Sequence, residues 1–294
     1  MKRYVKCCLV FAFCLCFFGC NGKIQKTDRE FEIIASNFPL YDIARAVGGQ
    51  EVQVKLLLKP GVESHSFEPS PKDIIGIEQA DLFLCIGGES EAWVKSLAGN
   101  HTLSLIHSVE LHHHEGHDHG IDEHIWTNPE HVKKMAEVIC DELCNLHPEK
   151  RDVYQNNLNQ YKEELSQLDA RFRKTVQEGK RKKVVFADRF PFLYFSEKYG
   201  LEYLAAFPGC ASQAEPSAAQ MKTLITTVKQ ETIPVIFYLE LSNQTIADAV
   251  SEETGAKKAL FHSCHNVTQE EFEAGETYLS LMNQNCDRLE EALN

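Results

Sequence analysis

The chain has 294 residues, and its 43 acidic side chains outnumber its 30 Lys and Arg side chains, so the formal net charge is −13. Hydrophobic residues make up 43% of the sequence and charged residues 25%, which is the composition of a folded globular protein rather than a disordered one. The acidity argues against nucleic-acid binding, because binding to phosphates needs many Lys and Arg side chains. The length fits one to two domains, each with its own core.

The N-terminal segment has the pattern of an export signal. Three basic residues precede a run of twelve almost wholly apolar residues, 7–18. As a helix this run would rise only about 18 Å, too short for a hydrocarbon core of about 30 Å. It ends in FFGC, which resembles a bacterial lipobox, where the Cys is acylated and becomes the new N-terminus. We expect a signal peptide at 1–19 and a tether at 20–30 that begins at lipidated Cys20; ordinary signal cleavage nearby is the alternative.

Processing at Cys20 changes the charge and the cysteine count. Removal of residues 1–19 takes away three cations and no anion, so the net charge of the remaining chain is −16. Four of the eleven Cys leave with the segment and Cys20 carries lipid, so six remain, too few over so long a chain for a disulfide framework. We therefore expect a soluble body held beside a membrane.

The residues after the tether alternate between short apolar runs and helical periodicity, which is typical of βαβ units with a parallel sheet. Gly48-Gly49 closes the first expected helix, and Pro71 stands at the opening of the second. The expected strands are Glu32–Ser36, Val52–Leu58, Asp81–Ile86 and Thr102–Ile106, and the expected helices are Pro39–Val47 and Ser70–Gln79.

Residues 128–178 form two helices in this prediction. The first opens at Asn128-Pro129 and is stopped by Pro148. The second, Glu149–Glu178, carries apolar side chains at spacings of three and four residues, so one apolar stripe runs along an otherwise polar helix. Such a helix would be about 45 Å long, enough to span a two-lobed protein.

The α/β alternation resumes after Gly179. The expected strands are Lys183–Ala187, Glu202–Ala206, Pro234–Leu239 and Lys258–Phe261, and the expected helices are Ser217–Gln230, Asn243–Thr254 and Phe272–Leu293. The fold class is therefore α/β: two similar lobes, each a parallel-rich sheet flanked by helices, bridged by one long connecting helix. The expected boundaries are 31–127 for the N-terminal lobe, 128–179 for the connector and 180–294 for the C-terminal lobe.

Side chains that bind metals follow several of these strands or lie at loop–helix junctions. Imidazole and carboxylate together suit Zn²⁺ or Mn²⁺, and imidazole favours zinc. Each residue alone would be read as a surface or capping residue, but their shared placement at strand ends of both lobes indicates a metal site. The candidates are His65 in PGVESHSFEPSP, His124 in DEHIWTNP, Asp188 in KKVVFADRF, Glu240 at the end of VIFYLE, and His262-Ser263-Cys264-His265 after the last strand.

A second metal signal is the segment HHHEGHDHGIDEH at 112–124, which holds six of the thirteen His and four acidic residues. Its composition cannot pack a core, so we expect an exposed loop. Metal capture is favoured over a merely hydrophilic loop, with weak binding and fast exchange. The His residues assigned to this loop are His112, His113, His114, His117 and His119.

Four segments, PGVESHSFEPSP, DEHIWTNP, FADRFPFLYFSEKYGL and ETYLSLMNQN, together with the long helix between them, resemble the zinc/manganese substrate-binding lipoproteins of bacterial ABC importers in order and spacing. The resemblance covers about residues 30–294. It implies two α/β lobes bridged by one helix, metal held in the cleft by both lobes, and delivery to a membrane permease. It also implies a monomer on the outer side of a bacterial membrane, anchored by lipid on Cys20.

Residue by residue, His65 and His124 match the two His ligands of the N-terminal lobe in that family. Where many members have a His followed by an acidic residue, this chain has Asp188, which we take as the substitute ligand. The last ligand of the family is usually an Asp shortly after the final strand, and here no Asp exists; His265 is the best replacement and Cys264 the next. Glu240 is either a further ligand or a neighbour of the site. The His-rich loop favours zinc over manganese.

Other interpretations stay open at this point. An exported zinc hydrolase would use Glu240 or Glu63 as general base, but the sequence has no HExxH motif and four protein ligands would close the zinc shell. A surface adhesin would use the same body. Cys140 and Cys144 are expected to be core residues, and a disulfide between Cys210 and Cys264 is left undecided.

Overall fold

The computed structural model describes residues 30–294 except 65–66, 98–100, 112–120, 208 and 210–215. Several residues singled out above therefore lie outside the described residues: Cys20, His65, the five His of the His-rich loop, and Cys210. Within the described ranges, none of the helices combines the length and the apolar character needed to cross a membrane.

The first sheet has four parallel strands in the order β2-β1-β3-β4. The helices of this part include α2, which begins after the Asn37 cap and ends at Gly49 with φ of +59°, and α3, which has a capping box between Ser70 and Asp73. The strands are β1 (Phe31–Ala35), β2 (Val52–Leu56), β3 (Leu82–Cys85) and β4 (Thr102–Ser104); the helices are α2 (Phe38–Gly48) and α3 (Pro71–Gln79), with 3₁₀ turns η1 (Gly49–Glu51), η2 (Ala92–Ser96), η3 (Ile106–Ser108) and η4 (Ile125–Thr127).

The second sheet repeats this topology with four parallel strands in the order β6-β5-β7-β8. The strands are β5 (Lys183–Phe186), β6 (Glu202–Ala205), β7 (Val235–Tyr238) and β8 (Lys257–Leu260), and the helices are α6 (Leu193–Tyr199), α7 (Ala218–Gln230), α8 (Thr245–Thr254), α9 (Gln269–Ala274) and α10 (Tyr278–Leu293). Both sheets reverse their strand order at the centre, between β1 and β3 and between β5 and β7. Ligands of open α/β sheets bind beyond the strand ends at such a point.

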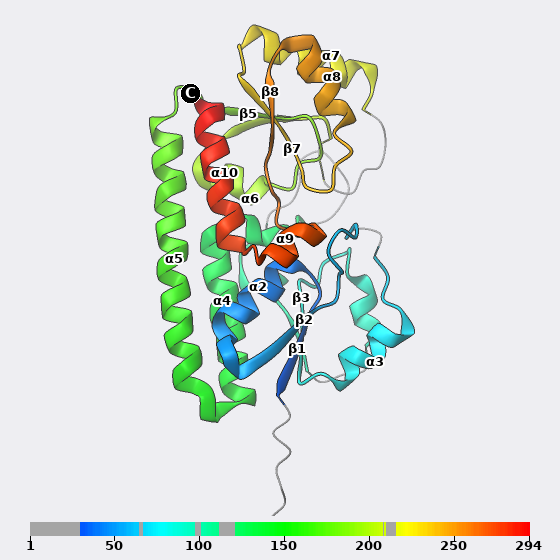
Figure 1. Cartoon of the computed structure of the whole chain (residues 1–294), viewed down its shortest axis with the longest axis vertical. Helices are drawn as coiled ribbons and strands as arrows, with labels where there is room; N and C mark the ends of the chain where they lie inside the picture. The colour runs from blue at the N-terminus through cyan, green and yellow to red at the C-terminus, as the bar shows by residue number, and fades with distance from the viewer. Residues whose placement is uncertain (1–29, 65–66, 98–100, 112–120, 208, 210–215) are drawn as a thin grey trace, which may run out of the picture. The chain divides into compact units, whose positions relative to one another are not determined.

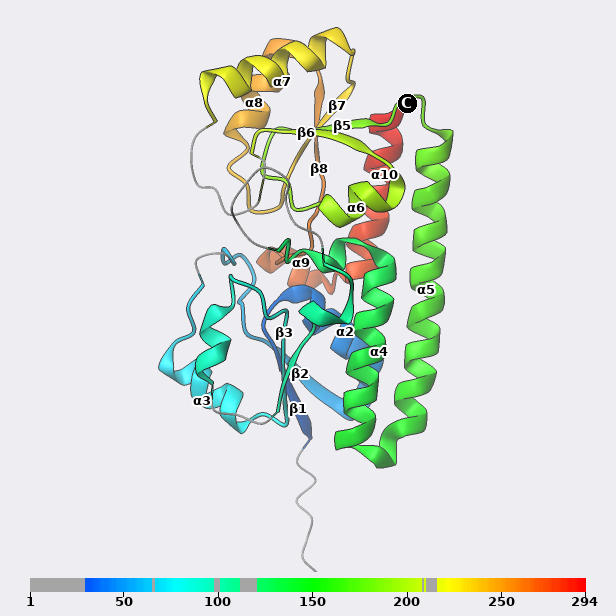
Figure 2. The same cartoon turned by 180° about the vertical axis from the view of Figure 1, so that it is seen from behind.

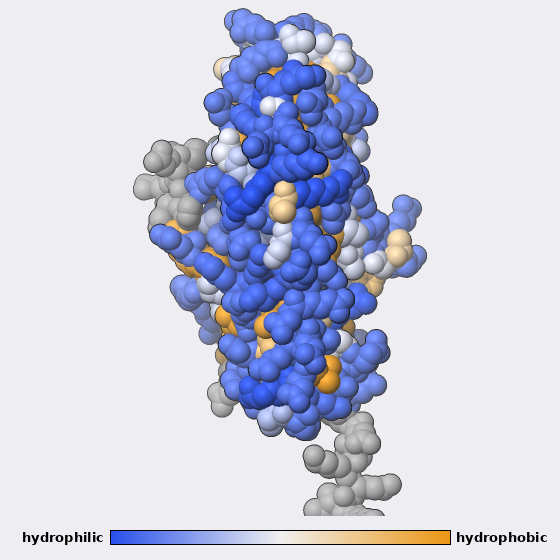
Figure 3. All heavy atoms as spheres, turned by 90° about the vertical axis from the view of Figure 1, so that its left-hand side faces the viewer, coloured by the Kyte–Doolittle hydropathy of each residue, from blue (hydrophilic) through white to orange (hydrophobic). Residues whose placement is uncertain are grey.

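Two long helices connect the sheets, α4 (Pro129–Leu146) and, after the 3₁₀ turn η5 (Pro148–Lys150), α5 (Arg151–Glu178). Figures 1 and 2 show α5 running beside both sheets, packed against α4 along one half and α10 along the other. Tyr161, Leu165 and Phe172 lie on its buried stripe, as the spacing predicts. The opposite side carries mainly hydrophilic residues, with a few scattered hydrophobic ones (Figure 3). The expected fold of two α/β lobes bridged by one long helix is confirmed.

One hydrophobic core runs through both halves, from Ile33 and Leu84 in the first sheet, past Leu165 on α5, to Phe237 in the second. In the second half the core is aromatic: Phe261 lies 4.8 Å from Phe237 between ring centroids. Aromatic pairs of this kind add about 0.5–1.5 kcal/mol each beyond the area they bury. The segment after β8 therefore leaves the second sheet from a firmly packed position.

Several sequence-based element boundaries differ from the structure by one or two residues, the helix α6 (Leu193–Tyr199) was not expected, and three differences are informative. The single helix expected over Phe272–Leu293 is two helices, because Gly275 takes φ of +76° and ends α9, and Thr277 then caps α10. The strand expected to reach Leu58 ends at Leu56, and the strand expected to reach Ile106 ends at Ser104. Leu58 and Ile106 are buried although they lie outside the regular sheet. The apolar runs in the sequence therefore continue beyond the ends of the strands.

Candidate metal centre

His124 lies just before η4, where the chain enters α4, and its side chain is buried. One carboxylate oxygen of Asp122 is 2.7 Å from His124 Nδ1 and also accepts the backbone N–H of His124 at 2.8 Å. A carboxylate at this position holds the proton on Nδ1, which leaves Nε2 as the metal-binding nitrogen. Asp122 is therefore an orienting partner of the kind that zinc-bound histidines have, and the sequence analysis gave it no role.

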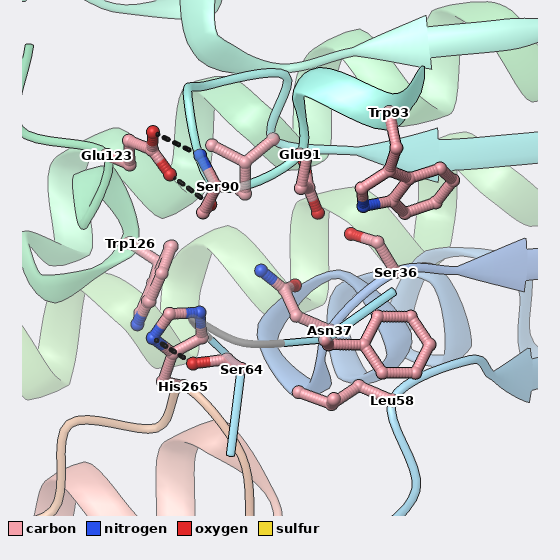
Figure 4. A pocket seen from close by; sticks show the side chains of 12 residues that line it. Ser36, Asn37, Leu58, Ser64, Ser90, Glu91, Trp93, Glu123, Trp126 and His265 are labelled. Atoms are coloured by element: carbon pink, nitrogen blue, oxygen red, sulfur yellow. Dashed lines mark hydrogen bonds between the residues drawn. The ribbon is translucent and has the colours of Figure 1, made fainter. Parts of the chain in front are cut away.

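The imidazole of His265 lies next to that of His124. The two ring centroids are 5.4 Å apart and the rings are nearly perpendicular, at 86°. The hydroxyl of Ser64, the residue before His65 in the sequence, is 3.2 Å from His265 Nδ1. Figure 4 shows this contact, with the Trp126 ring beside His265. Two of the predicted ligands are thus brought together from opposite halves of the chain.

The Trp126 indole ring contacts the rings of both histidines. Its ring centroid is 5.3 Å from that of His124 and 4.9 Å from that of His265. The indole Nε1–H donates to the carbonyl oxygen of Ser263 at 2.8 Å, and the Tyr278 hydroxyl donates to the carbonyl oxygen of Trp126 at 2.8 Å. An indole that is fully buried and hydrogen-bonded in this way forms a fixed wall, so the histidine pair is held rather than mobile.

The segment that carries His265 is attached to the first lobe, although it follows a strand of the second. Its neighbour Asn266 is buried, with its side-chain amide directed at the loop between β2 and α3. The segment makes three hydrogen bonds to this loop: Asn266 Nδ2 to the carbonyl oxygen of Lys59 at 2.8 Å, Asn266 Nδ2 to that of Val62 at 2.9 Å, and Gly61 N to that of Val267 at 2.7 Å. We call these bonds the Asn266 clamp. His265 was expected to be a ligand of the C-terminal lobe; its segment follows β8 and is bonded to Glu240 there, and the clamp joins it to the loop of the N-terminal lobe as well.

Asp188 follows β5 at the point where the second sheet reverses its strand order. Its Oδ2 accepts the backbone N–H of Leu239 at 3.1 Å and its Oδ1 accepts the N–H of Arg189 at 2.8 Å, so the carboxylate is fixed by the backbone on both sides. The guanidinium Nε of Arg189 lies 3.9 Å from Oδ1. Arg189 and His265 line one pocket at the boundary of the lobes, which brings the Asp188 loop to the edge of the histidine site.

These elements can be compared with those of known proteins. A family model described as "Zinc-uptake complex component A periplasmic" (ZnuA) matches residues 33–292 of the chain. The chain belongs to this family. Members share the two-lobed arrangement: the crystal structure of the Zn(II)-bound ZnuA-like domain of Streptococcus pneumoniae AdcA superposes with a TM-score of 0.78 at 30% identity, covering 90% of this chain and 99% of that one.

Two curated ZnuA-family relatives and one further structure extend the comparison. Zinc-binding lipoprotein AdcA of Streptococcus pneumoniae is 29% identical over 96% of this chain and 60% of its own length, so the chain spans about three fifths of that relative. The high-affinity zinc uptake system protein ZnuA of Bacillus subtilis is 28% identical over 93% of this chain and 91% of its own. The laminin binding protein Lmb of Streptococcus agalactiae, described as having adhesin and metal transporting activity, superposes with a TM-score of 0.79 at 26% identity over 90% of this chain and 100% of that one.

Glu240 and Cys264 are the two remaining candidate ligands of this chain, and both side chains have other contacts. Glu240 is buried, its Oε2 accepts the N–H of Ser263 at 2.8 Å, and its Oε1 accepts the Ser263 hydroxyl. Cys264 is fully buried with φ of +60°, and burial raises the pKa of its thiol well above the usual range. Metals bind the thiolate, so this environment favours His265 over Cys264.

His262 is a buried residue to which the sequence analysis gave no separate role. Its Nδ1 accepts the N–H of Cys264 at 2.9 Å, and its Nε2 lies 3.6 Å from a carboxylate oxygen of Glu271. Burial lowers the pKa of His262, but the carboxylates of Glu240 and Glu271 outweigh this and raise it overall. The Asn285 side chain accepts the backbone N–H of His262 and donates to its carbonyl oxygen, both at 2.7 Å. His262 thus shapes the turn that presents His265. In the sequence, the pattern HSCH, which contains both histidines, is the signal for this role.

Among the residues that the structure describes, no group of three or more His, Cys, Asp or Glu side chains is close enough to hold a metal ion. The two members of the histidine pair, His124 and His265, do come together. His65 lies outside the described residues, and Ser64 next to it contacts His265. Cys140 and Cys144 are buried thiols 4.0 Å apart, and Cys264 is a free thiol.

Proposed function

We propose that this protein binds a zinc ion between its lobes on the outer side of a bacterial membrane and passes it to the permease of an ABC importer. The observation that carries this proposal is the edge-to-face pair of His124 and His265, with Asp122 orienting the first ring and Ser64 and Trp126 placing the second. Membership of the zinc-uptake component A family supports zinc as the cargo and an importer as the destination.

The proposed ligands are His65, His124, His265 and Asp188. Three imidazoles and one carboxylate make a four-coordinate shell of the type zinc prefers, whereas Mn²⁺ prefers more oxygen ligands. Asp188 keeps a lone pair on each oxygen after its two backbone hydrogen bonds, so it is able to accept a metal. Glu240 supports the Ser263 turn in this proposal and is not a ligand.

A transport role fits the site better than hydrolysis. A hydrolytic zinc needs an open coordination position and a free general base. Glu240 is bonded to Ser263 through both oxygens, and Glu63 is paired with Arg189. Neither carboxylate named as a general base is placed to activate water, so we infer that the protein is not an enzyme.

We further propose that the body is a monomer attached through lipid on Cys20 and that the His-rich loop at 112–124 gathers zinc near the site. The acidic mature chain attracts divalent cations at the membrane surface. An adhesin role, suggested by the similarity to Lmb, would share the body with metal transport, since Lmb is described as having both activities.

Competition titration against a chromophoric chelator tests the proposal on chain 21–294. The wild type is expected to take up one tightly bound Zn²⁺ and to bind Mn²⁺ at least about a hundredfold more weakly. His265→Ala is expected to lose most of the affinity, and His107→Ala, which changes an exposed imidazole outside the site, to keep it. Equal zinc affinity in wild type and His265→Ala would refute the site.

A further inference from the structure

The boundary between the lobes carries a positive charge next to a proposed ligand. Arg189 Nη1 donates to a carboxylate oxygen of Glu63 at 3.3 Å, and its Nε lies 3.9 Å from Asp188 Oδ1. The Arg189 side chain is 19% exposed and Asp188 only 9%, so solvent screens this contact incompletely. The guanidinium is permanently charged and bridges a carboxylate of each lobe.

Asp188 is one of the proposed zinc ligands, and Glu63 stands two residues before another, His65. Arg189, Glu63 and His265 line one pocket, so the guanidinium borders the same cavity as one histidine of the pair. Two cations that share the oxygens of Asp188 repel each other, and the repulsion is larger where solvent screens it little. A metal therefore has to share or displace the contacts of Arg189.

We propose that Arg189 is a resident cation that competes with zinc for the Asp188 carboxylate, with Glu63 as its second partner, and so sets the affinity and release rate of the site. This inference rests on the proposed function. When zinc is absent, the single charge of the guanidinium balances part of the charge of the two carboxylates across the lobe boundary; when zinc binds Asp188, Arg189 gives up that contact. Return of the guanidinium to Asp188 then favours release of the ion.

The Asn266 clamp makes the lobe boundary the point where this competition acts. Glu63 belongs to the loop that the clamp joins to the His265 segment, so Glu63, His124 and His265 share one frame. Asp188 and Arg189 follow β5 and are bonded to Leu239 after β7, and the next residue, Glu240, accepts the N–H of Ser263 in the His265 segment. Arg189 thus opposes the metal at Asp188, the proposed ligand that follows β5 of the second sheet.

A rival role for Arg189 is to position Asp188, and the two roles predict opposite changes in zinc affinity when the guanidinium is removed. The bond that orients Asp188 Oδ1 comes from the backbone N–H of Arg189, so it survives any side-chain change at this position other than proline. Loss of the guanidinium then leaves the carboxylate in place and removes only the charge. Competition predicts tighter zinc binding in such a variant, and positioning predicts weaker binding.

The test compares zinc affinity and dissociation rate in chain 21–294 between wild type, Arg189→Gln and Arg189→Lys. The matched control is Arg173→Gln, which removes an arginine paired with Asp169 on α5. We expect Arg189→Gln to bind zinc about tenfold more tightly, which is about 1.4 kcal/mol, mainly through slower dissociation. Arg189→Lys and Arg173→Gln should stay within about threefold of wild type, because lysine keeps the charge and Arg173 lies outside the site.

A second comparison separates charge competition from a change in folding. Glu63→Gln removes the other partner of the guanidinium and should weaken zinc binding, because Arg189 then interacts with Asp188 alone. This weakening should disappear in the double variant that also carries Arg189→Gln. Unchanged or weaker binding in Arg189→Gln, with an unchanged melting temperature of the metal-free protein, overturns the competition. A wild type that binds no zinc refutes the proposed function instead, so the two failures are distinguishable.

Discussion

The His124 ring meets the His265 ring edge to face, with the two ring centroids 5.4 Å apart. His124 is oriented by Asp122 two residues before it, and His265 by the Asn266 clamp and by the Ser64 hydroxyl. Bonds from Ser263 to Glu240 also join the His265 segment to the second lobe, so the pair lies where the two lobes meet.

Removal of the charge that orients His124 is expected to weaken zinc binding. Asp122→Asn keeps the size of the side chain but loses the carboxylate that holds the proton on Nδ1. Changes in such orienting partners cost about 10- to 100-fold in metal affinity. Chelator competition measures the effect, with Asp141→Asn on the exposed side of α4 as control. Equal affinities in the two variants would show that Asp122 does not orient a ligand.

The clamp is expected to contribute to both stability and affinity. Asn266→Ala leaves the carbonyl oxygens of Lys59 and Val62 without the amide donor, which costs about 1–3 kcal/mol. Because His265 is the next residue, zinc affinity should fall together with the denaturation midpoint. Asn156→Ala on the exposed face of α5 is the control and should change neither. Loss of stability without loss of affinity would mean that the clamp does not position His265.

The His-rich loop is expected to add weak sites without creating the tight one. Replacing its five His by Gln should leave one tight zinc per chain and remove additional zinc bound at higher concentration, since a loop without a packed core cannot preorganise ligands. Isothermal titration calorimetry of the variant beside wild type measures both classes of site. His124 is kept in this variant. If the tight site disappears, the loop rather than the histidine pair holds the ion.

Buried Asp42 is expected to make stability depend on pH. Burial raises its pKa to about 6 from 3.8, against the hydrogen bond from Tyr278 N–H, which lowers it. The folded state therefore favours the protonated acid: the benefit is complete below about pH 4 and is lost as the pH rises through about 6. Relative to Asp42→Asn, the free energy of unfolding of the wild type should decrease by on the order of 3 kcal/mol between pH 4 and 7.

Denaturant titrations of zinc-free protein at several pH values check this prediction. Asn at position 42 still offers an oxygen to Tyr278 N–H, so the comparison isolates ionisation. Asp141→Asn is the control with an exposed carboxylate. A constant difference between wild type and Asp42→Asn across this range would contradict a buried, ionising Asp42.

The sequence predicted the architecture well because local patterns determine it. The β3 residues Leu82–Cys85 are all buried, and a strand covered on both faces reads as an unbroken apolar run. The spacing of Tyr161, Leu165 and Phe172 defines the buried stripe of α5. The break before α10 was missed although Gly275 is a helix-ending residue, because the apolar periodicity continues across it.

The site was predicted only in part, because its geometry depends on long-range hydrogen bonds. That His124 and His265 bind one ion remains a prediction; that they lie together is a property of the structure. The attachment of His265 to the first lobe rests on side-chain bonds from Asn266 to backbone carbonyls, and no sequence periodicity encodes such bonds. Asp122 was within reach of sequence reasoning, since it stands two residues before His124.

The most direct test of the zinc site is an anomalous difference map measured at the zinc absorption edge from crystals of the zinc-loaded protein. The account predicts one strong peak per chain within about 2.1 Å of Nε2 of His124 and of a ring nitrogen of His265. A strong peak elsewhere, or a zinc ion that contacts neither histidine, would contradict it.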